Sequence, residues 1–172
     1  SELLNKFTSF MSYESLPGMF NIGSDFYSIK TDDSGVTSIY KQFAGKYNIF
    51  FGDYKPFYIT FRVNPDIKMD KIFNTIDYRA DMFDDDGTLT KDTFDTLEVW
   101  NEYQHGLSKL TDTPARNSSI RKKFRIWRAQ IPRSDSNNRD RIRNPWIYLK
   151  LESNTRNILR MDFHDMIVNY FE

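Results

Sequence analysis

Three consecutive aspartates, Asp84–Asp86, precede Gly87, and carboxylates at this spacing could bind a divalent cation. A calcium-binding EF-hand loop with Gly87 at its sixth position requires a carboxylate at its first position and a bidentate glutamate at its twelfth. The sequence has Met82 and Thr93 at these two positions. We therefore expect a turn with solvated carboxylates and no metal site.

Glutamates and histidines are the other candidates for catalysis. Glu98 and Glu102 would lie ~13 Å apart on one strand, whereas the carboxylate pairs of glycosidases lie ~5–9.5 Å apart. His164 is close in sequence to Asp162 and Asp165, which predicts a histidine–carboxylate contact, but no G-x-S-x-G nucleophile motif accompanies it. The chain has no cysteine, which excludes disulfides and cysteine-based sites. We expect no catalytic residues, no enzyme activity and no cofactor.

Charge is distributed unevenly along the chain, although the formal net charge is zero. Residues 1–114 contain 11 Lys and Arg against 18 Asp and Glu, a net charge of −7, and residues 115–172 contain 13 against 6, a net charge of +7. Ten of the basic residues lie between Arg116 and Arg143, interspersed with Phe124 and Trp127. Arginine mixed with large aromatic residues is enriched at protein interfaces.

We interpret residues 121–148 as a basic surface that docks on an acidic surface of another subunit. The candidate interface residues are Arg121, Lys123, Arg125, Trp127, Arg128, Arg139, Arg141, Arg143 and Trp146. The candidate acidic partners, on a second chain of the same type, are Asp77, Asp81, Asp84, Asp85, Asp86, Glu98 and Glu102. Copies that carry one acidic and one basic surface can associate through unlike faces.

Two other binding functions remain open. Arg121, Lys123 and Arg125 would share a strand face with Trp127, and charge combined with a stacking ring is typical of nucleic-acid sites. Against this, the whole chain is neutral and its pI is 6.7. A carbohydrate-binding module would need Trp100 or Trp146 to lie flat on an exposed face.

The composition predicts a mainly β fold. Aromatic residues make up 16% of the chain, whereas alanine, the strongest helix former, occurs only four times. We expect an antiparallel β-sandwich-like domain over residues 47–172. Residues 1–46 would form a separate segment that continues a preceding domain, with a short helix over 2–11 and a β-meander. No apolar run reaches the ~20 residues of a membrane span, so we expect no membrane partner.

Alternating apolar and polar residues, with turn signals between them, predict the strands. Asp25–Lys30 and Val36–Lys41 are expected to form a hairpin, and Tyr47–Phe51 is expected to pair with Phe57–Val63. Further expected strands are Ile72–Phe83, Leu97–Tyr103, Lys123–Ile131, Trp146–Leu151 and one within Ile158–Phe171.

Several long strings of the sequence resemble one known family. They are F-T-S-F-M-S-Y-E (7–14), Y-N-I-F-F-G (47–52), D-K-I-F-N-T-I-D-Y-R-A-D (70–81), T-F-D-T-L-E-V-W-N-E-Y-Q (93–104), K-K-F-R-I-W-R-A-Q-I-P-R (122–133), D-R-I-R-N-P-W-I-Y-L-K-L (140–151) and F-H-D-M-I-V-N-Y-F (163–171). Together they resemble the C-terminal region of the tail stabilisation, or muzzle, protein of crAss-like bacteriophages.

The resemblance implies a structural component of the virion, located at the tail or portal vertex. Several copies would assemble into a homo-oligomeric ring, bind other tail and portal proteins, lie close to packaged DNA and help to retain it. Full-length members of the family are longer than this chain, which therefore resembles a piece of a longer or processed polypeptide. The family implies no catalytic residues and no cofactor.

Overall fold

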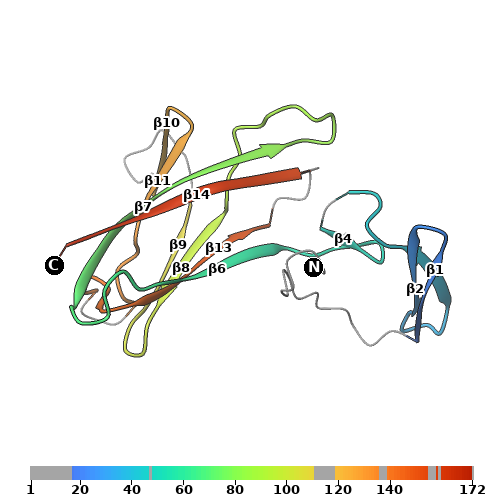
Figure 1. The fold of residues 1–172 in the computed structure, drawn as a ribbon, viewed down its shortest axis with the longest axis horizontal. Coiled ribbons are helices and arrows are strands. Elements are labelled where there is room, and N and C mark those ends of the chain that lie inside the picture. Colours follow the sequence, from blue (N-terminus) through green and yellow to red (C-terminus); the bar gives the residue numbers. More distant parts are fainter. Residues whose placement is uncertain are drawn as a thin grey trace. The chain divides into compact units, whose positions relative to one another are not determined.

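The computed structural model describes residues 17–46, 48–110, 119–135, 139–154, 158 and 160–171. All regular structure in these residues is β-strand, in antiparallel pairs, and none of it is a helix that could cross a membrane. The expected helix over residues 2–11 lies outside the described residues. The chain divides into two compact units, Ser1–Gly45 and Lys46–Glu172, whose strands are drawn in Figure 1.

The N-terminal unit contains a three-stranded meander of β1 (Gly18–Ile22), β2 (Asp25–Thr31) and β3 (Thr37–Lys41). The expected hairpin between the second and third of these strands is confirmed. Asp32 stabilises its turn, because its Oδ1 accepts hydrogen bonds from the backbone N–H groups of Ser34 and Val36 at 3.0 and 2.8 Å. Side-chain oxygens of aspartate commonly close turns in this way.

The larger unit contains two sheets. The first is built around the long strand β7 (Lys71–Phe83), which pairs with β14 (Arg160–Phe171) along one edge. The other edge of β7 pairs with β11 (Ile126–Gln130) and β12 (Arg143–Asn144), and β10 (Ile120–Lys123) extends the sheet beyond β11. Residues Thr75 to Tyr78 therefore have a hydrogen-bonded neighbour on both sides.

The second sheet has the order β6 (Phe57–Val63), β13 (Ile147–Ser153), β8 (Thr96–Trp100) and β9 (His105–Lys109). The expected pairing of Tyr47–Phe51 with Phe57–Val63 is wrong. The short strand β4 (Ile49–Phe50) pairs instead with β5 (Asp53–Tyr54), and β6 pairs with β13. Gly52, at φ 84°, allows the chain to turn back directly after β4.

The two sheets share one apolar core, which makes the larger unit an antiparallel β-sandwich. Ile76 of β7, Val99 of β8 and Leu149 of β13 are completely buried between the sheets. Aromatic rings connect the layers, since Phe94 lies 5.7 Å from Tyr78 and 6.1 Å from Phe57 between ring centroids. The alternation of buried and exposed residues along β13 and β6 is the pattern of strands with one face in a core.

Two local irregularities position polar side chains. His164 is an extra residue in β14, because Phe163 pairs with Ala80 and Asp165 with Arg79. Asn74 is likewise an extra residue in β7, opposite the Asn169–Tyr170 step of β14. Such β-bulges bend a strand and redirect a side chain, and both bulged residues contribute to the surfaces described below.

Candidate functional site

The outer face of β7 and β11 carries ion pairs within one chain. Arg128 lies opposite Asp77, and its Nε and Nη2 donate to the two carboxylate oxygens at 2.6 Å each. Arg125 Nη2 donates to Asp81 Oδ2 at 2.5 Å, and His164 Nε2 contacts the same oxygen at 3.0 Å. The side chains of Asp77 and Asp81 are only 14% and 9% exposed.

Hydrogen bonds from the basic residues keep these carboxylates charged. The hydrogen bond from Arg128 lowers the pKa of Asp77 below its usual value, against the opposing effect of burial. Burial is the largest single effect on Asp81 and raises its pKa, but hydrogen bonds from His164 and Arg125, with their charges, outweigh it and the pKa is lowered overall.

Part of the predicted docking surface is therefore already bound to carboxylates of its own chain. Arg125 and Arg128, expected to bind another subunit, bind Asp81 and Asp77, which were expected as partners on that other subunit. Antiparallel pairing of β11 with β7 places Arg128 directly opposite Asp77, whereas Arg125 reaches Asp81 from the turn between β10 and β11.

Trp127 lies in the core and not on the surface. The expected strand Lys123–Ile131 is wrong, because Phe124 and Arg125, at φ 51° and 68°, form a two-residue turn between β10 and β11. The turn places Trp127 on the inner face, 1% exposed, and its Nε1 has no hydrogen-bond partner among the described residues. A nucleic-acid groove that uses Trp127 as a stacking ring is therefore excluded.

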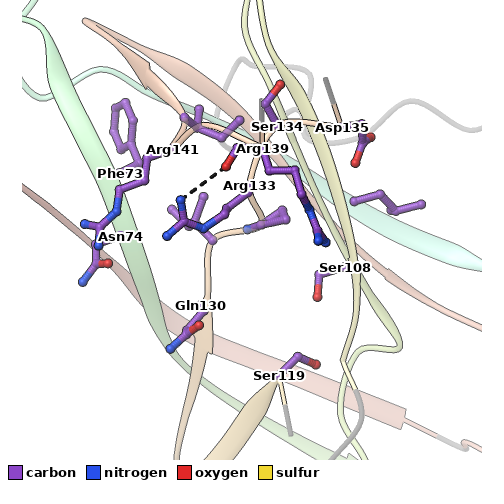
Figure 2. A pocket seen from close by; sticks show the side chains of 14 residues that line it. Phe73, Asn74, Ser108, Ser119, Gln130, Arg133, Ser134, Asp135, Arg139 and Arg141 are labelled. Atoms are coloured by element: carbon purple, nitrogen blue, oxygen red, sulfur yellow. Dashed lines mark hydrogen bonds between the residues drawn. The ribbon is translucent and has the colours of Figure 1, made fainter. Parts of the chain in front are cut away.

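A surface pocket of about 860 Å³ lies beside this sheet, where the chain crosses from β11 to β12. Figure 2 shows the side chains of Arg133, Arg139 and Arg141 around it. The remaining lining residues are Phe73, Asn74, Leu107, Ser108, Ser119, Gln130, Ile131, Pro132, Ser134, Asp135 and Ile142. We call this feature the arginine pocket.

Backbone contacts fix the segment that carries the first of these arginines. Asp135 N–H donates to the carbonyl of His105 at 2.7 Å, and Ser134 N–H donates to the carbonyl of Asp140 at 2.8 Å. A Cβ atom added to Gly106 of β9 would lie 2.6 Å from the carbonyl oxygen of Arg133, so glycine is needed at this close approach.

The bulge and the arginines of the crossing segment complete the pocket. The carbonyl of Asn74 accepts a hydrogen bond from Ile131 N–H at 2.9 Å, which joins β7 to the start of the segment. Arg133 Nη1 donates to the carbonyl of Arg139 at 3.3 Å, the contact dashed in Figure 2.

The three guanidinium groups of the arginine pocket have no carboxylate partner among the residues that the structure describes. The one acidic residue in the lining, Asp135, is bound by His105 Nδ1 at 2.7 Å. Guanidinium groups bind carboxylates and phosphates through paired, charge-assisted hydrogen bonds. The pocket can therefore hold an anionic group.

His105 joins Asp135 to the second sheet. Its Nε2 contacts Glu98 Oε1 at 2.9 Å, and Glu98 also lies 3.8 Å from Lys150 Nζ. The hydrogen bond to Glu98, followed by that to Asp135, raises the pKa of His105 against the effect of burial. Glu98, an expected acidic partner for another subunit, is thus also engaged within its own chain.

The acidic turn after β7, residues Asp84 to Leu89, is partly engaged as well. Asp84 Oδ1 accepts hydrogen bonds from the backbone N–H groups of Asp86 and Thr88, and Asp85 forms an ion pair with Lys46. The Asp86 carboxylate has no side-chain partner in the described part of the chain, and Leu89 is 50% exposed. No group of metal-binding side chains occurs in that part either.

The remaining candidates lie on the surface. Arg121 of β10 and Glu102 are exposed, the Nζ of Lys123 lies 5.5 Å from the ring of Phe124, and Arg143 Nε lies 3.7 Å from Asp70 Oδ2.

Trp100 of β8 and Trp146, which directly precedes β13, do not form a flat platform. Trp100 stacks on Tyr148 at 5.3 Å, Trp146 meets Tyr148 edge to face at 5.2 Å, and the guanidinium of Arg62 lies 5.1 Å from the ring centre of Trp146. Their ring faces contact other residues of the chain, which is not the arrangement that a carbohydrate platform needs.

Sequence reasoning missed Arg133 and Asn74 of the arginine pocket, and also Gly106, whose close approach to Arg133 lies beside it. Arg133 is the last residue of the string K-K-F-R-I-W-R-A-Q-I-P-R (122–133). Nothing in the pattern of residues indicated that the segment after β11 folds over β9. Asn74 lines the pocket as the extra residue of a β-bulge in β7, and the local sequence carries no signal of that bulge.

The fold and this surface define an antiparallel β-sandwich domain with an arginine-lined pocket on one side. The model of the crassvirus muzzle protein C-terminal domain matches residues 45–134, and the chain belongs to this family. The matched range contains β4 to β11 and the start of the crossing segment.

A curated relative shows the same similarity over the whole chain. The chain is 57% identical over 171 residues to the "Muzzle protein" of Bacteroides phage crAss001. The alignment covers 99% of this chain and 12% of the relative. The chain therefore spans about an eighth of the length of that protein.

Proposed function

We propose that this chain is a non-enzymatic, structural part of a phage virion, which assembles with other proteins of the tail or portal vertex. Membership of the muzzle family supports the class. The observation that carries the assembly role is the arginine pocket, because three arginines converge there without a carboxylate from the described residues.

The pocket is a better docking site than the outer face of β7 and β11. Arg125 and Arg128 are held by carboxylates, so a partner would have to break existing contacts to bind them. Arg139 and Arg141 are exposed, and bind an incoming carboxylate without that loss. Charge pairs of this kind fix the register and the choice of partner more than they add affinity.

Within this proposal, several copies form a ring that binds neighbouring tail and portal proteins and helps to retain packaged DNA. Direct binding of DNA by the arginine pocket is the alternative. It would give binding to short duplexes that weakens steeply as salt is added, because counterions are released on binding.

The test is incorporation into virus particles. The protein that contains this chain is produced with Arg139→Glu and Arg141→Glu, and its amount in purified particles is measured by mass spectrometry. We expect strongly reduced incorporation with an intact β-sandwich fold. The control is Lys68→Glu, a charge reversal at an exposed residue that does not line the pocket. Equal incorporation of both variants would contradict the proposal.

A further inference from the structure

We propose that the arginine pocket of one copy receives the acidic turn, residues Asp84 to Leu89, of a second copy. This inference rests on the proposed assembly role and names the partner of the pocket. It predicts a head-to-tail contact between identical chains.

The chemistry of the pocket favours a polypeptide as its occupant. Beside the three arginines, its wall contains Leu107, which is 54% exposed, and Pro132. A phosphate backbone offers no apolar group to cover Leu107, whereas a peptide can supply carboxylates and an apolar side chain together. The volume of about 860 Å³ is within the ~300–1,000 Å³ typical of ligand pockets.

The acidic turn has the complementary features. It presents the exposed Asp86, whose carboxylate has no side-chain partner in the described part of the chain, next to Leu89, which is 50% exposed. Asp85 is also exposed, and it would exchange its ion pair with Lys46 for the arginines of the pocket. Asp84 closes the turn through its own backbone contacts, so the turn keeps its shape before it meets a partner. A preorganised segment loses less conformational entropy on binding.

Strand β7 places the two surfaces at opposite ends. The pocket contains Phe73 and Asn74 at the start of β7, and the acidic turn follows Phe83 at its end. Figure 1 shows β7 as one continuous strand that leads into this turn. At ~3.4 Å per residue the two surfaces lie about 34 Å apart, so one chain cannot fill its own pocket.

A contact between unlike surfaces is heterologous, and repeated copies then close into a ring or continue as a filament. The charge asymmetry of the sequence agrees with this, since the turn lies in the part that carries −7 and the pocket arginines in the part that carries +7. At each contact, one copy would present negative charge and its neighbour positive charge.

The experiment measures self-association of the 172-residue chain by sedimentation velocity, up to about 1 mM. We expect the mean mass to rise with concentration, and to rise less when salt screens the charges. Neutralising the pocket (Arg139→Gln with Arg141→Gln) or the turn (Asp85→Asn with Asp86→Asn) should each weaken association about tenfold or more. Lys68→Gln and Asp33→Asn are matched controls on other exposed charges and should leave it unchanged.

Mixing the two neutralised variants gives the sharpest result. One keeps an intact turn and the other an intact pocket, so the mixture should form dimers and nothing larger. A chain that stays monomeric throughout, variants that associate like the wild type, or a mixture that stays monomeric would overturn the inference. So would pocket-dependent binding of a short DNA duplex by a monomeric chain.

The particle experiment separates this inference from the proposed function. If the pocket variant fails to enter particles while the wild-type chain is monomeric in solution, the pocket binds another tail protein. The assembly role then stands and the self-contact is wrong. If the pocket variant enters particles normally, the assembly role itself is wrong.

Discussion

Arg128 and Asp77 meet across two neighbouring strands through a pair of 2.6 Å hydrogen bonds, one to each carboxylate oxygen. Asn169 of β14 adds a longer contact to the same carboxylate, 3.4 Å from Oδ2. The carboxylate thus joins β11, β7 and β14 on the outer face of the sheet. This arrangement explains why the most basic part of the chain is not simply a free surface.

Replacing Arg128 should destabilise the larger unit. In Arg128→Gln the largely buried carboxylate of Asp77 loses its cationic partner. We therefore expect a lower midpoint of urea unfolding. Arg121→Gln is the matched control, because Arg121 lies opposite Arg128 on β10 and has no ion pair in the described residues. Equal effects of the two substitutions would show that the ion pair contributes nothing.

Acid should weaken the same contact. The pKa of Asp77 is lowered in the folded protein by Arg128, so its contribution to stability is present above the ordinary aspartate value of 3.8 and is lost as pH falls through the folded pKa. We expect the stability difference between wild type and Asp77→Asn to shrink as urea unfolding is repeated below about pH 4. A difference that stays constant down to pH 2 would contradict this assignment.

The contribution of His105 to stability should have the opposite pH dependence. Its pKa is raised above 6.5 by Glu98 first and Asp135 second, so its contribution is complete below 6.5 and is lost as pH rises through the folded pKa. We expect an NMR titration of the imidazole to move to lower pH in Glu98→Gln, and by a smaller amount in Asp135→Asn. A titration that neither variant changes would rule out both contacts.

Gly106 should be intolerant of a side chain. Gly106→Ala places a Cβ atom 2.6 Å from the carbonyl of Arg133, and we expect a loss of about 1–3 kcal/mol in the free energy of unfolding from this overpacking. The neighbouring Leu107→Ala, at a position 54% exposed, is the control and should cost much less. Comparable losses from both would argue against the close approach.

Trp127 should be replaceable by phenylalanine but not by alanine. Trp127→Ala removes a fully buried ring and should cost about 3–5 kcal/mol in urea unfolding. Trp127→Phe keeps most of the apolar contact and removes an indole N–H that has no hydrogen-bond partner in the part of the chain that the structure describes, so we expect a much smaller loss. The prediction fails if the two variants are equally unstable.

The long strands were predictable because their side chains alternate over many residues. The expected strand Ile72–Phe83 matches β7, and Phe57–Val63 is β6 to the residue, since each has one face in the core. The β10–β11 hairpin was not predictable, because Phe124 and Arg125 lack the glycine or asparagine usual at positive φ. The error moved Trp127 from the core to the predicted surface.

The candidate site was predictable in composition but not in detail. The concentration of arginine in the sequence pointed to the region that holds both the ion-paired face and the arginine pocket. Which arginines remain without a carboxylate depends on strand register, because Arg128 reaches Asp77 only when β11 pairs with β7. Residues 51 positions apart in sequence carry no local signal of that register.

Strand β7 is paired through backbone hydrogen bonds with β14 along most of its length and with β11 and β12 along part of its other edge, whereas the β4–β5 ribbon has two paired residues on each side. Tension applied between the two ends of β7 would run parallel to the strand and load these bonds in shear, many at a time. A ribbon pulled apart at one end breaks its bonds one after another. Tension along the line that connects the arginine pocket to the acidic turn is therefore resisted by many hydrogen bonds at once.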